Sequence, residues 1–250
     1  MDMRRFLRIG RLLGDESVHT LSECHVTVVG MGAVGSYALE VLARSGVGHL
    51  RVVDFDTVGI TNINRQLLAT DSTIGIKKVQ VARERILDIN PDAVVEPLDL
   101  FAHEDTLDQI LAQRVDIVLD AIDSLTPKLA LLEGVYRRNI PVISSMGAAL
   151  RTDPSQITTA DLMDTYGCPL AKQVRTKLRR RGVERGIRTV FSPEPVDYRY
   201  EEPDQEEHAE HNEQILDRGR RRKVLGSLPS ITGLFGLRLG HEAVFSLLDL

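Results

Sequence analysis

The sequence predicts a Rossmann-like α/β fold, a doubly wound and mostly parallel sheet, on three observations. Short apolar segments alternate with segments of helical periodicity from residue 25 to about residue 145. The apolar segments lack polar alternation, as expected of parallel strands that are covered on both faces. A glycine-rich turn at residues 30–35 joins the first strand to the first helix. Together these features predict one sheet with helices on both faces.

The same periodicity sets the expected elements. Strands are expected over residues 26–29, 50–53, 94–98, 115–119 and 140–144. Helices are expected over residues 33–44, 75–89, 106–113 and 127–138. Asn90-Pro91 ends the second of these helices, because proline has no N–H with which to continue the helical hydrogen bonds.

We expect a single domain over residues 1–250. Its core comprises about residues 5–150 and a C-terminal helix within 226–250, and a variable lobe spans about residues 152–225. Within this lobe, residues 171–188 form a basic, helix-like stretch, residues 201–213 are acidic, and residues 218–223 are basic again. His208 and His211 stand among glutamates, which indicates a solvated acidic loop rather than a metal site.

Composition indicates a cytoplasmic protein. The net charge is −5, so the chain as a whole lacks the positive excess typical of nucleic-acid binding, although a local basic patch remains compatible with it. The two cysteines, Cys24 and Cys168, form no Cys-x-x-Cys pair, which argues against a structural zinc and fits a reducing compartment. Charged residues interrupt the apolar tail 225–250, so it is expected to be an amphipathic helix without stable membrane insertion.

The glycine-rich turn has the spacing of a phosphate-binding loop. Gly30 allows the tight turn, Gly32 lets a phosphate approach the backbone, and Gly35 lets the helix lie close to the sheet. The free N–H groups of the helix N-terminus then form an anion site. Asp54 follows Gly30 by 24 residues and ends the second strand, where a carboxylate accepts hydrogen bonds from ribose hydroxyls.

Asn62, Arg65 and Lys78 distinguish the use of ATP from the binding of a nicotinamide cofactor. Negative charge grows on a phosphoryl group under attack, and donors placed beforehand must stabilise it. Arg65 can bind phosphate in a bidentate way, and Lys78 supplies a point charge. Both could instead be ordinary surface cations. These three residues favour an enzyme that attacks the α-phosphate of a nucleotide.

Asp123 is the candidate magnesium ligand. It follows an apolar strand, at the carboxyl edge where α/β sheets bind ligands. Mg²⁺ prefers oxygen ligands and keeps several waters, so one carboxylate and phosphate oxygens suffice. Asp123 or Ser124 could also begin the following helix, a compatible role. Asp120 is expected to be a structural partner near the strand end.

These motifs resemble the ThiF/MoeB/ubiquitin-activating-enzyme superfamily over about residues 5–150. The shared features are Gly30-x-Gly32-x-x-Gly35, Val53-Asp-Phe-Asp56, Asn62-x-x-Arg65-Gln66, Lys78 and Asp120-Ala-Ile-Asp123. Further features resemble its tRNA threonylcarbamoyladenosine dehydratase branch. They are Arg5-Phe6, Arg11-Leu12, Pro127-Lys128, Gly147 before Asp153-Pro154, Pro169-Leu170 before the basic stretch, and Val190-Phe-Ser-Pro-Glu194.

The resemblance implies an ATP- and Mg²⁺-dependent homodimer that cyclises threonylcarbamoyladenosine beside the tRNA anticodon through an acyl-adenylate. Gly30, Gly32, Gly35, Asn62, Arg65 and Lys78 would then contact ATP phosphates, Asp54 would hold the ribose, and Asp123 would bind Mg²⁺, with Arg65, Lys78 and Asp123 catalytic. Arg11, or alternatively Arg8, would reach the partner subunit's site. The basic stretch is the natural phosphate contact for tRNA, although it could be only a charged helix face.

Three alternatives remain. Whichever function holds, a sulfur-relay or redox protein is a candidate partner. The first alternative is activation of the C-terminus of a ubiquitin-like sulfur-carrier protein. The missing Cys-x-x-Cys pairs weigh against it. The second is a nicotinamide-dependent oxidoreductase, against which Arg65 and Lys78 weigh. The third is a non-catalytic RNA-binding module that keeps the nucleotide fold.

Overall fold

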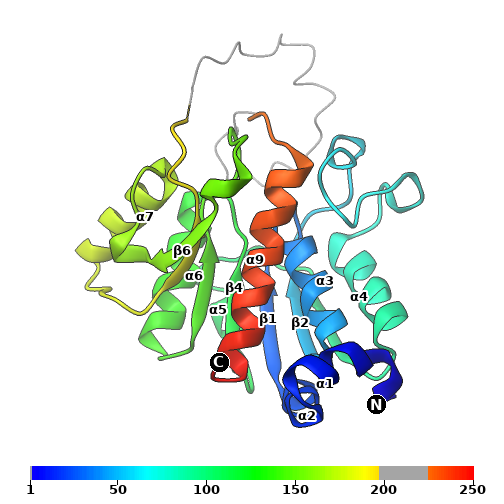
Figure 1. The fold of residues 1–250 in the computed structure, drawn as a ribbon. Helices are drawn as coiled ribbons and strands as arrows, with labels where there is room; N and C mark the ends of the chain where they lie inside the picture. The colour runs from blue at the N-terminus through cyan, green and yellow to red at the C-terminus, as the bar shows by residue number, and fades with distance from the viewer. Residues whose placement is uncertain (1, 197–224) are drawn as a thin grey trace.

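A computed structural model describes residues 2–196 and 225–250, and the structural statements below concern these residues. They form a seven-stranded sheet in the order β3-β2-β1-β4-β5-β7-β6, with helices on both faces (Figure 1). All neighbouring strands pair in parallel except β6 and β7. The predicted Rossmann-like, mostly parallel fold is therefore confirmed. The acidic and basic segments 201–213 and 218–223, with His208 and His211, lie outside the described residues.

The strands are short, and those at the centre of the sheet are buried. In chain order, the strands are β1 (His25–Val29), β2 (His49–Val53), β3 (Val94–Leu98), β4 (Ile117–Asp120), β5 (Val142–Ser145), β6 (Thr158–Asp161) and β7 (Arg188–Phe191). The helices are α1 (Leu7–Leu13), α2 (Asp15–Glu23), α3 (Gly35–Ser45), α4 (Lys78–Ile89), α5 (Leu107–Ile110), α6 (Leu125–Arg137), α7 (Pro169–Arg180) and α9 (Pro229–Leu247). Two buried clusters, one on each side of the sheet, form the core.

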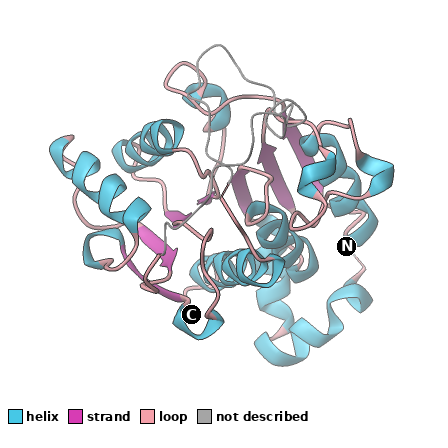
Figure 2. Ribbon diagram, turned by 90° about the horizontal axis from the view of Figure 1, so that it is seen from above, coloured by secondary structure: helices cyan, strands magenta, loops and turns pink. Residues whose placement is uncertain are grey.

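The helices divide between the two faces of the sheet. The first cluster contains the buried sides of α3, α4 and α9, and the second contains those of α5, α6 and α7. Seen from above, helices lie along both sides of the sheet (Figure 2). This arrangement follows from the burial of the central parallel strands, which must be covered on both faces.

α9 packs closely along α3 because the side of α9 that faces α3 carries glycines. A Cβ on Gly236 would lie 2.6 Å from Tyr37 Cβ, and a Cβ on Gly240 would lie 2.7 Å from Val41 Cβ. The two helices run side by side down the front of the molecule (Figure 1). Among the described segments, no helix combines the length and apolarity needed to cross a bilayer.

Several predicted helix boundaries were wrong, and positive φ angles explain most of them. The helix expected at residues 75–89 begins only at Lys78, because Gly75 has a φ of +83°. The helix expected at residues 106–113 is the single turn α5, and Gln113 has a φ of +62°. The basic helix ends at Arg180, before Gly182 with a φ of +77°.

The sequence reasoning missed β6 and β7. Each has four residues, and β6, at the sheet edge, contains Thr158 and Thr159 rather than an apolar run. β7 pairs with β5, so this part of the expected variable lobe continues the sheet, and α7 packs on α6. The single-domain boundaries stay a prediction.

Candidate functional site

The candidate site lies where the central parallel strands end. Val29 is paired with Val53 on one side and with Asp120 on the other, so the loops after β1, β2 and β4 leave the sheet at the same level. These strand ends face the upper edge of the molecule in Figure 1. The strand order reverses at β1, which makes this edge the topological switch point where α/β sheets bind ligands.

The glycine loop has different steric requirements at its three glycines. Gly30 has a φ of +96°, and a Cβ there would lie 2.9 Å from the Ala121 carbonyl oxygen. A Cβ on Gly35 would overlap the Gly30 carbonyl oxygen. At Gly32 the nearest atom to an added Cβ is Gln66 Nε2, at 4.0 Å. Gly30 and Gly35 are thus required by the fold, whereas Gly32 leaves open space above the backbone.

Asp54 ties the glycine loop to the end of β2. Its Oδ2 accepts the Met31 N–H at 2.6 Å, and its Oδ1 accepts the Asp56 N–H at 2.8 Å. Burial raises the pKa of Asp54 above its ordinary value, although the nearby charge of Lys78 opposes the rise. A carboxylate at this place can accept hydrogen bonds from ribose hydroxyls.

Lys78 is held at the same edge by Asp56. Its Nζ lies 3.0 Å from Asp56 Oδ2, and its side chain is 6% exposed. The Lys78 N–H also donates to the Asp56 carbonyl oxygen, so both the backbone and the side chain join the start of α4 to the loop after β2. The sequence offered Asp56 only as part of the Val53–Asp56 motif, and the structure makes it the partner of Lys78.

Arg65 approaches the glycine loop through its own segment. The Leu67 N–H donates to Ser36 Oγ in the first turn of α3, which fixes residues 65–67 beside the loop. Arg65 Nη1 donates to the Thr61 carbonyl oxygen at 2.9 Å and to Asn64 Oδ1 at 3.0 Å. Within residues 2–196 and 225–250 it pairs with no carboxylate, so its charge is available to an anion.

Asn62 has a structural task. It is 3% exposed, and its Oδ1 accepts the Gly59 N–H at 3.1 Å. This bond closes the turn that leads into residues 62–66, so Asn62 shapes the segment that carries Arg65.

Asp123 and Asp120 lie in different surroundings. Asp123 is exposed, in the turn between β4 and α6, and Ser124 is the N-cap of α6. Asp120 is 0% exposed and lies 2.5 Å from Lys128 Nζ, whose side chain is also 0% exposed. Asp120 also accepts the Ile122 N–H and the Ser144 hydroxyl. Both oxygens of Asp120 are therefore occupied, and only Asp123 has the exposure that a metal ligand needs.

The sequence reasoning missed the roles of Lys128 and Arg151. Lys128 anchors the turn before Asp123, and the available signal was a lysine in an otherwise apolar helix eight residues after Asp120. Arg151 follows β5 and is 2% exposed. No sequence pattern singled it out, because its burial results from the tertiary structure.

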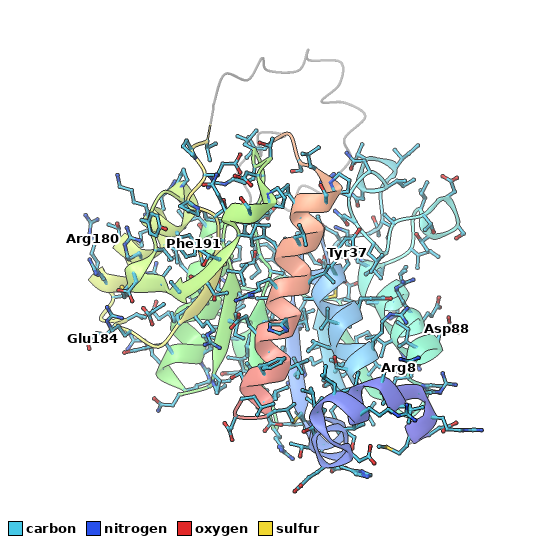
Figure 3. All side chains as sticks on the ribbon, viewed as in Figure 1. Arg8, Tyr37, Asp88, Arg180, Glu184 and Phe191 are labelled. Atoms are coloured by element: carbon cyan, nitrogen blue, oxygen red, sulfur yellow. The ribbon has the colours of Figure 1, made fainter. Side chains whose placement is uncertain are left out.

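Arg11 does not join the site of its own chain. It is exposed on α1, which lies at the opposite edge of the sheet, beside the starts of the strands (Figure 1). The preceding turn is held there by Arg5, which donates to the Ile89 carbonyl oxygen at the end of α4. Arg8, on the same helix, lies at the bottom of Figure 3, far from Tyr37 on α3. A role for Arg11 therefore requires a second subunit.

The sequence of this chain matches a family and proteins that are already named. A model of the ThiF family matches residues 4–250. The chain belongs to the ThiF family. It is 46% identical to the tRNA threonylcarbamoyladenosine dehydratase of Bacillus subtilis (strain 168) over 77% of this chain and 76% of that protein. It is 39% identical to the Escherichia coli (strain K12) protein of that name, over 78% and 75% of the two chains.

The solved structures agree with the sequence relatives. The crystal structure of E. coli tRNA N6-threonylcarbamoyladenosine dehydratase, TcdA, in complex with ATP has a TM-score of 0.86 and 33% identity. The match covers 99% of this ThiF-family chain and 95% of TcdA. The resemblance to the superfamily and to its dehydratase branch is therefore confirmed. The chain has the fold of an ATP-using ThiF-family enzyme.

Proposed function

We propose that this ThiF-family chain is an ATP-dependent tRNA threonylcarbamoyladenosine dehydratase. One observation carries the proposal. The chain matches the ATP complex of an enzyme of that name over nearly its whole length. The polar groups gathered at one edge of the sheet support it, because hydrogen bonds and an ion pair join the glycine loop, Asp54, Lys78 and the Arg65 segment there.

The proposed nucleotide site uses both sides of the glycine loop. The N–H groups at the start of α3, beside Gly32, donate hydrogen bonds to phosphate oxygens, and Asp54 accepts hydrogen bonds from the ribose hydroxyls. Arg65 and Lys78 supply positive charge near the α-phosphate, where charge increases in the transition state. Asn62 acts through the turn that positions Arg65, so it is a positioning residue rather than a direct phosphate ligand.

The proposed reaction has two steps. The carboxylate of the threonyl group attacks the α-phosphorus of ATP, a P–O bond forms, and pyrophosphate leaves. The nitrogen of the side chain on the modified adenosine then attacks the activated carbonyl carbon. The new C–N bond closes the ring, the nitrogen loses its proton, and AMP leaves. The net change is conversion of ATP to AMP and pyrophosphate with loss of one water from the tRNA.

Mg²⁺ fits the proposed site only if the protein and the nucleotide both supply its oxygen ligands. Among the described residues, no group of three or more histidine, cysteine, aspartate or glutamate side chains could enclose an ion. Both oxygens of Asp120 are engaged, so Asp123 is the carboxylate that would hold Mg²⁺, together with phosphate oxygens and waters. Bound there, Mg²⁺ would neutralise phosphate charge.

The tRNA would contact the exposed side of α7. Ala171, Val174 and Leu178 bury the inner side of this helix. Its outer side carries four cations without an acidic partner among the described residues: Lys172, Lys177, Arg179 and Arg180. α7 begins beside Gly147, which follows β5 at the edge of the candidate site. A basic surface that leads away from the site suits an RNA backbone.

Assembly and compartment complete the proposal. A homodimer would bring Arg11 to the second subunit's site, since its own site lies at the other edge of the sheet. We place the enzyme in the cytoplasm, in keeping with its proposed tRNA substrate and its two free cysteines.

The test is incubation with ATP, Mg²⁺ and threonylcarbamoyladenosine-bearing tRNA, followed by mass analysis of the nucleosides. We expect loss of one water with equal formation of AMP and pyrophosphate. Arg65→Ala and Asp123→Ala should abolish most turnover, whereas Arg83→Ala, an exposed cation on α4, is the matched control. Adenylation of a sulfur-carrier protein alone, oxidation of a nicotinamide, or full activity of both site variants would contradict the proposal.

A further inference from the structure

Arg151 is a buried arginine, and two nitrogens of its guanidinium have no hydrogen-bond partner among the described residues. Its side chain is 2% exposed, and its Nε and Nη1 have neither solvent contact nor a hydrogen-bond acceptor. A guanidinium carries five N–H donors and stays charged at all ordinary pH values. Burying an unsatisfied charged donor is costly, so a residue in this state requires an explanation beyond packing.

Glu194 interacts electrostatically with Arg151 but does not supply the missing acceptor. Glu194 accepts hydrogen bonds from the Thr152 N–H, the Thr152 hydroxyl and the Asp153 N–H, at 2.9 to 3.1 Å. Burial would raise the pKa of Glu194, but these bonds and the charge of Arg151 hold it below its ordinary value. Glu194 thus stays ionised and fixes the backbone of the two residues that follow Arg151, without a hydrogen bond to the guanidinium.

The position of Arg151 points to the site. It follows β5, which is the neighbour of β4 on the side away from β1. Asp120 is paired with Ser144, so the loop after β5 leaves the sheet beside the turn that carries Asp123. Across the switch point, the ribose partner Asp54 and the cations Arg65 and Lys78 surround the nucleotide side. Arg151 comes from the β5 side, across β1 and β4 from these groups, which leaves it free to serve the second reactant.

We infer that Arg151 binds the carboxylate of the acceptor substrate and holds it for attack on ATP. The inference rests on the proposed function and adds to it a binding residue for the reacting group. A guanidinium fork matches a carboxylate in two parallel hydrogen bonds, which fixes the orientation of the attacking oxygen. Because the nitrogens are covered in the free enzyme, the loop must shift to admit the carboxylate.

Phosphate is the competing anion, since the same fork binds it equally well. The cations already gathered on the β1–β2 side favour the carboxylate for Arg151. The experiment must therefore distinguish three roles of Arg151: binding of the carboxylate, binding of a phosphate, and a purely structural role.

The first arm compares Arg151→Met with Arg151→Lys and with Arg51→Met. Arg51 is also a buried arginine, but Glu96 and two carbonyl oxygens satisfy it. We expect Arg151→Met to raise the KM for modified tRNA by about ten- to a hundredfold, the worth of a charged hydrogen bond. The KM for ATP should not change, and Arg151→Lys should recover part of the loss. Arg51→Met should lower the Tm without changing either KM.

The second arm removes the charge from the ligand. Inhibition by the free threonylcarbamoyladenosine nucleoside is compared with inhibition by its carboxamide. The wild-type enzyme should prefer the acid, and Arg151→Met should lose that preference. A raised KM for ATP would assign Arg151 to phosphate, and a lower Tm with both KM values intact would make it structural; either result overturns the inference. If the wild type fails to convert modified tRNA, the proposed function itself fails, and the inference fails with it.

Discussion

At the scale of single residues, the site depends on how each polar group is satisfied. Asp120 and Asn62 are buried, and their oxygens accept hydrogen bonds from backbone donors or Lys128, so they hold loops in place. Asp54 is only partly buried, and each of its oxygens accepts one backbone N–H, so it can hold the glycine loop and still accept hydrogen bonds from a ribose. Arg65 lacks an acidic partner within the described parts of the chain, and Arg151 has unsatisfied nitrogens. Groups of the first kind build the site, and groups of the second kind are available to ligands.

Two alanine variants of the glycine loop should separate folding from nucleotide binding. Gly35→Ala would place a Cβ against the Gly30 carbonyl oxygen, so we expect a clear loss of stability by thermal unfolding. Gly32→Ala meets only Gln66 Nε2, at 4.0 Å, so its Tm should stay close to that of the wild type. Its KM for ATP should rise, because the methyl group occupies the open space. A Gly32→Ala enzyme with wild-type KM would contradict the assignment of this loop to phosphate.

The raised pKa of Asp54 predicts a pH-dependent stability. Because burial raises the pKa in the folded state, the folded protein holds the proton more tightly than the unfolded chain. Asp54 therefore stabilises the fold most below its unfolded pKa, and this contribution falls as the pH rises through the folded pKa. In denaturant unfolding from pH 4 to pH 7, the free energy of unfolding of the wild type should fall relative to that of Asp54→Asn. A difference that moves the other way would refute the assignment.

At the scale of elements, the strand ends and helix starts supply the site, and α7 supplies a surface. Parallel strands bring the loops after β2, β1, β4 and β5 to one edge. The buried pair between Asp120 and Lys128 then joins β4 to α6 beneath the turn of Asp123. Buried ion pairs often stabilise less than apolar packing would, so we interpret this pair as a device that fixes the turn.

The outer side of α7 should determine the salt dependence of tRNA binding. The Lys172→Ala/Lys177→Ala variant removes two exposed cations, and Arg181→Ala/Arg185→Ala removes the same charge from cations paired with Glu133 and Asp164. For the first variant, the slope of log K against log salt should fall by about 0.7 to 0.9 per lost phosphate contact. The second should change it little. Arg180 points outward in Figure 3, at the far end of the helix. Equal effects of both variants would indicate a non-specific charge effect.

At the scale of the whole molecule, the N-terminal helices raise the question of assembly. α1 and α2 lie at the edge of the sheet opposite the candidate site (Figure 1). Leu12, on α1, is 81% exposed, and Arg11 stands beside it. An arginine so placed can serve a nucleotide only in a second copy, across a symmetric interface.

Mixing of inactive subunits tests this arrangement. Arg11→Ala and Lys78→Ala should each be inactive alone, but a mixed dimer would have one site with wild-type Lys78 and Arg11 of the partner subunit. If assortment is random, equimolar mixing and refolding should restore about a quarter of wild-type turnover per subunit. Arg83→Ala mixed with Lys78→Ala is the positive control: every Arg83→Ala subunit keeps a complete site, so about half of wild-type turnover per subunit is expected whatever the pairing. No recovery above the separate variants would exclude a role for Arg11 across subunits.

The sequence by itself determined the alternation of strands and helices in the core of the sheet, and it predicted a nucleotide at the carboxyl ends of the strands. Local patterns encode these features: apolar runs make parallel strands, glycine spacing makes an anion loop, and Asp54, Arg65 and Lys78 follow at informative positions. The tertiary structure alone decided how polar groups are paired. It buried Lys128 against Asp120 and left Arg151 without an acceptor, because burial and hydrogen bonding depend on segments that meet only in the folded chain.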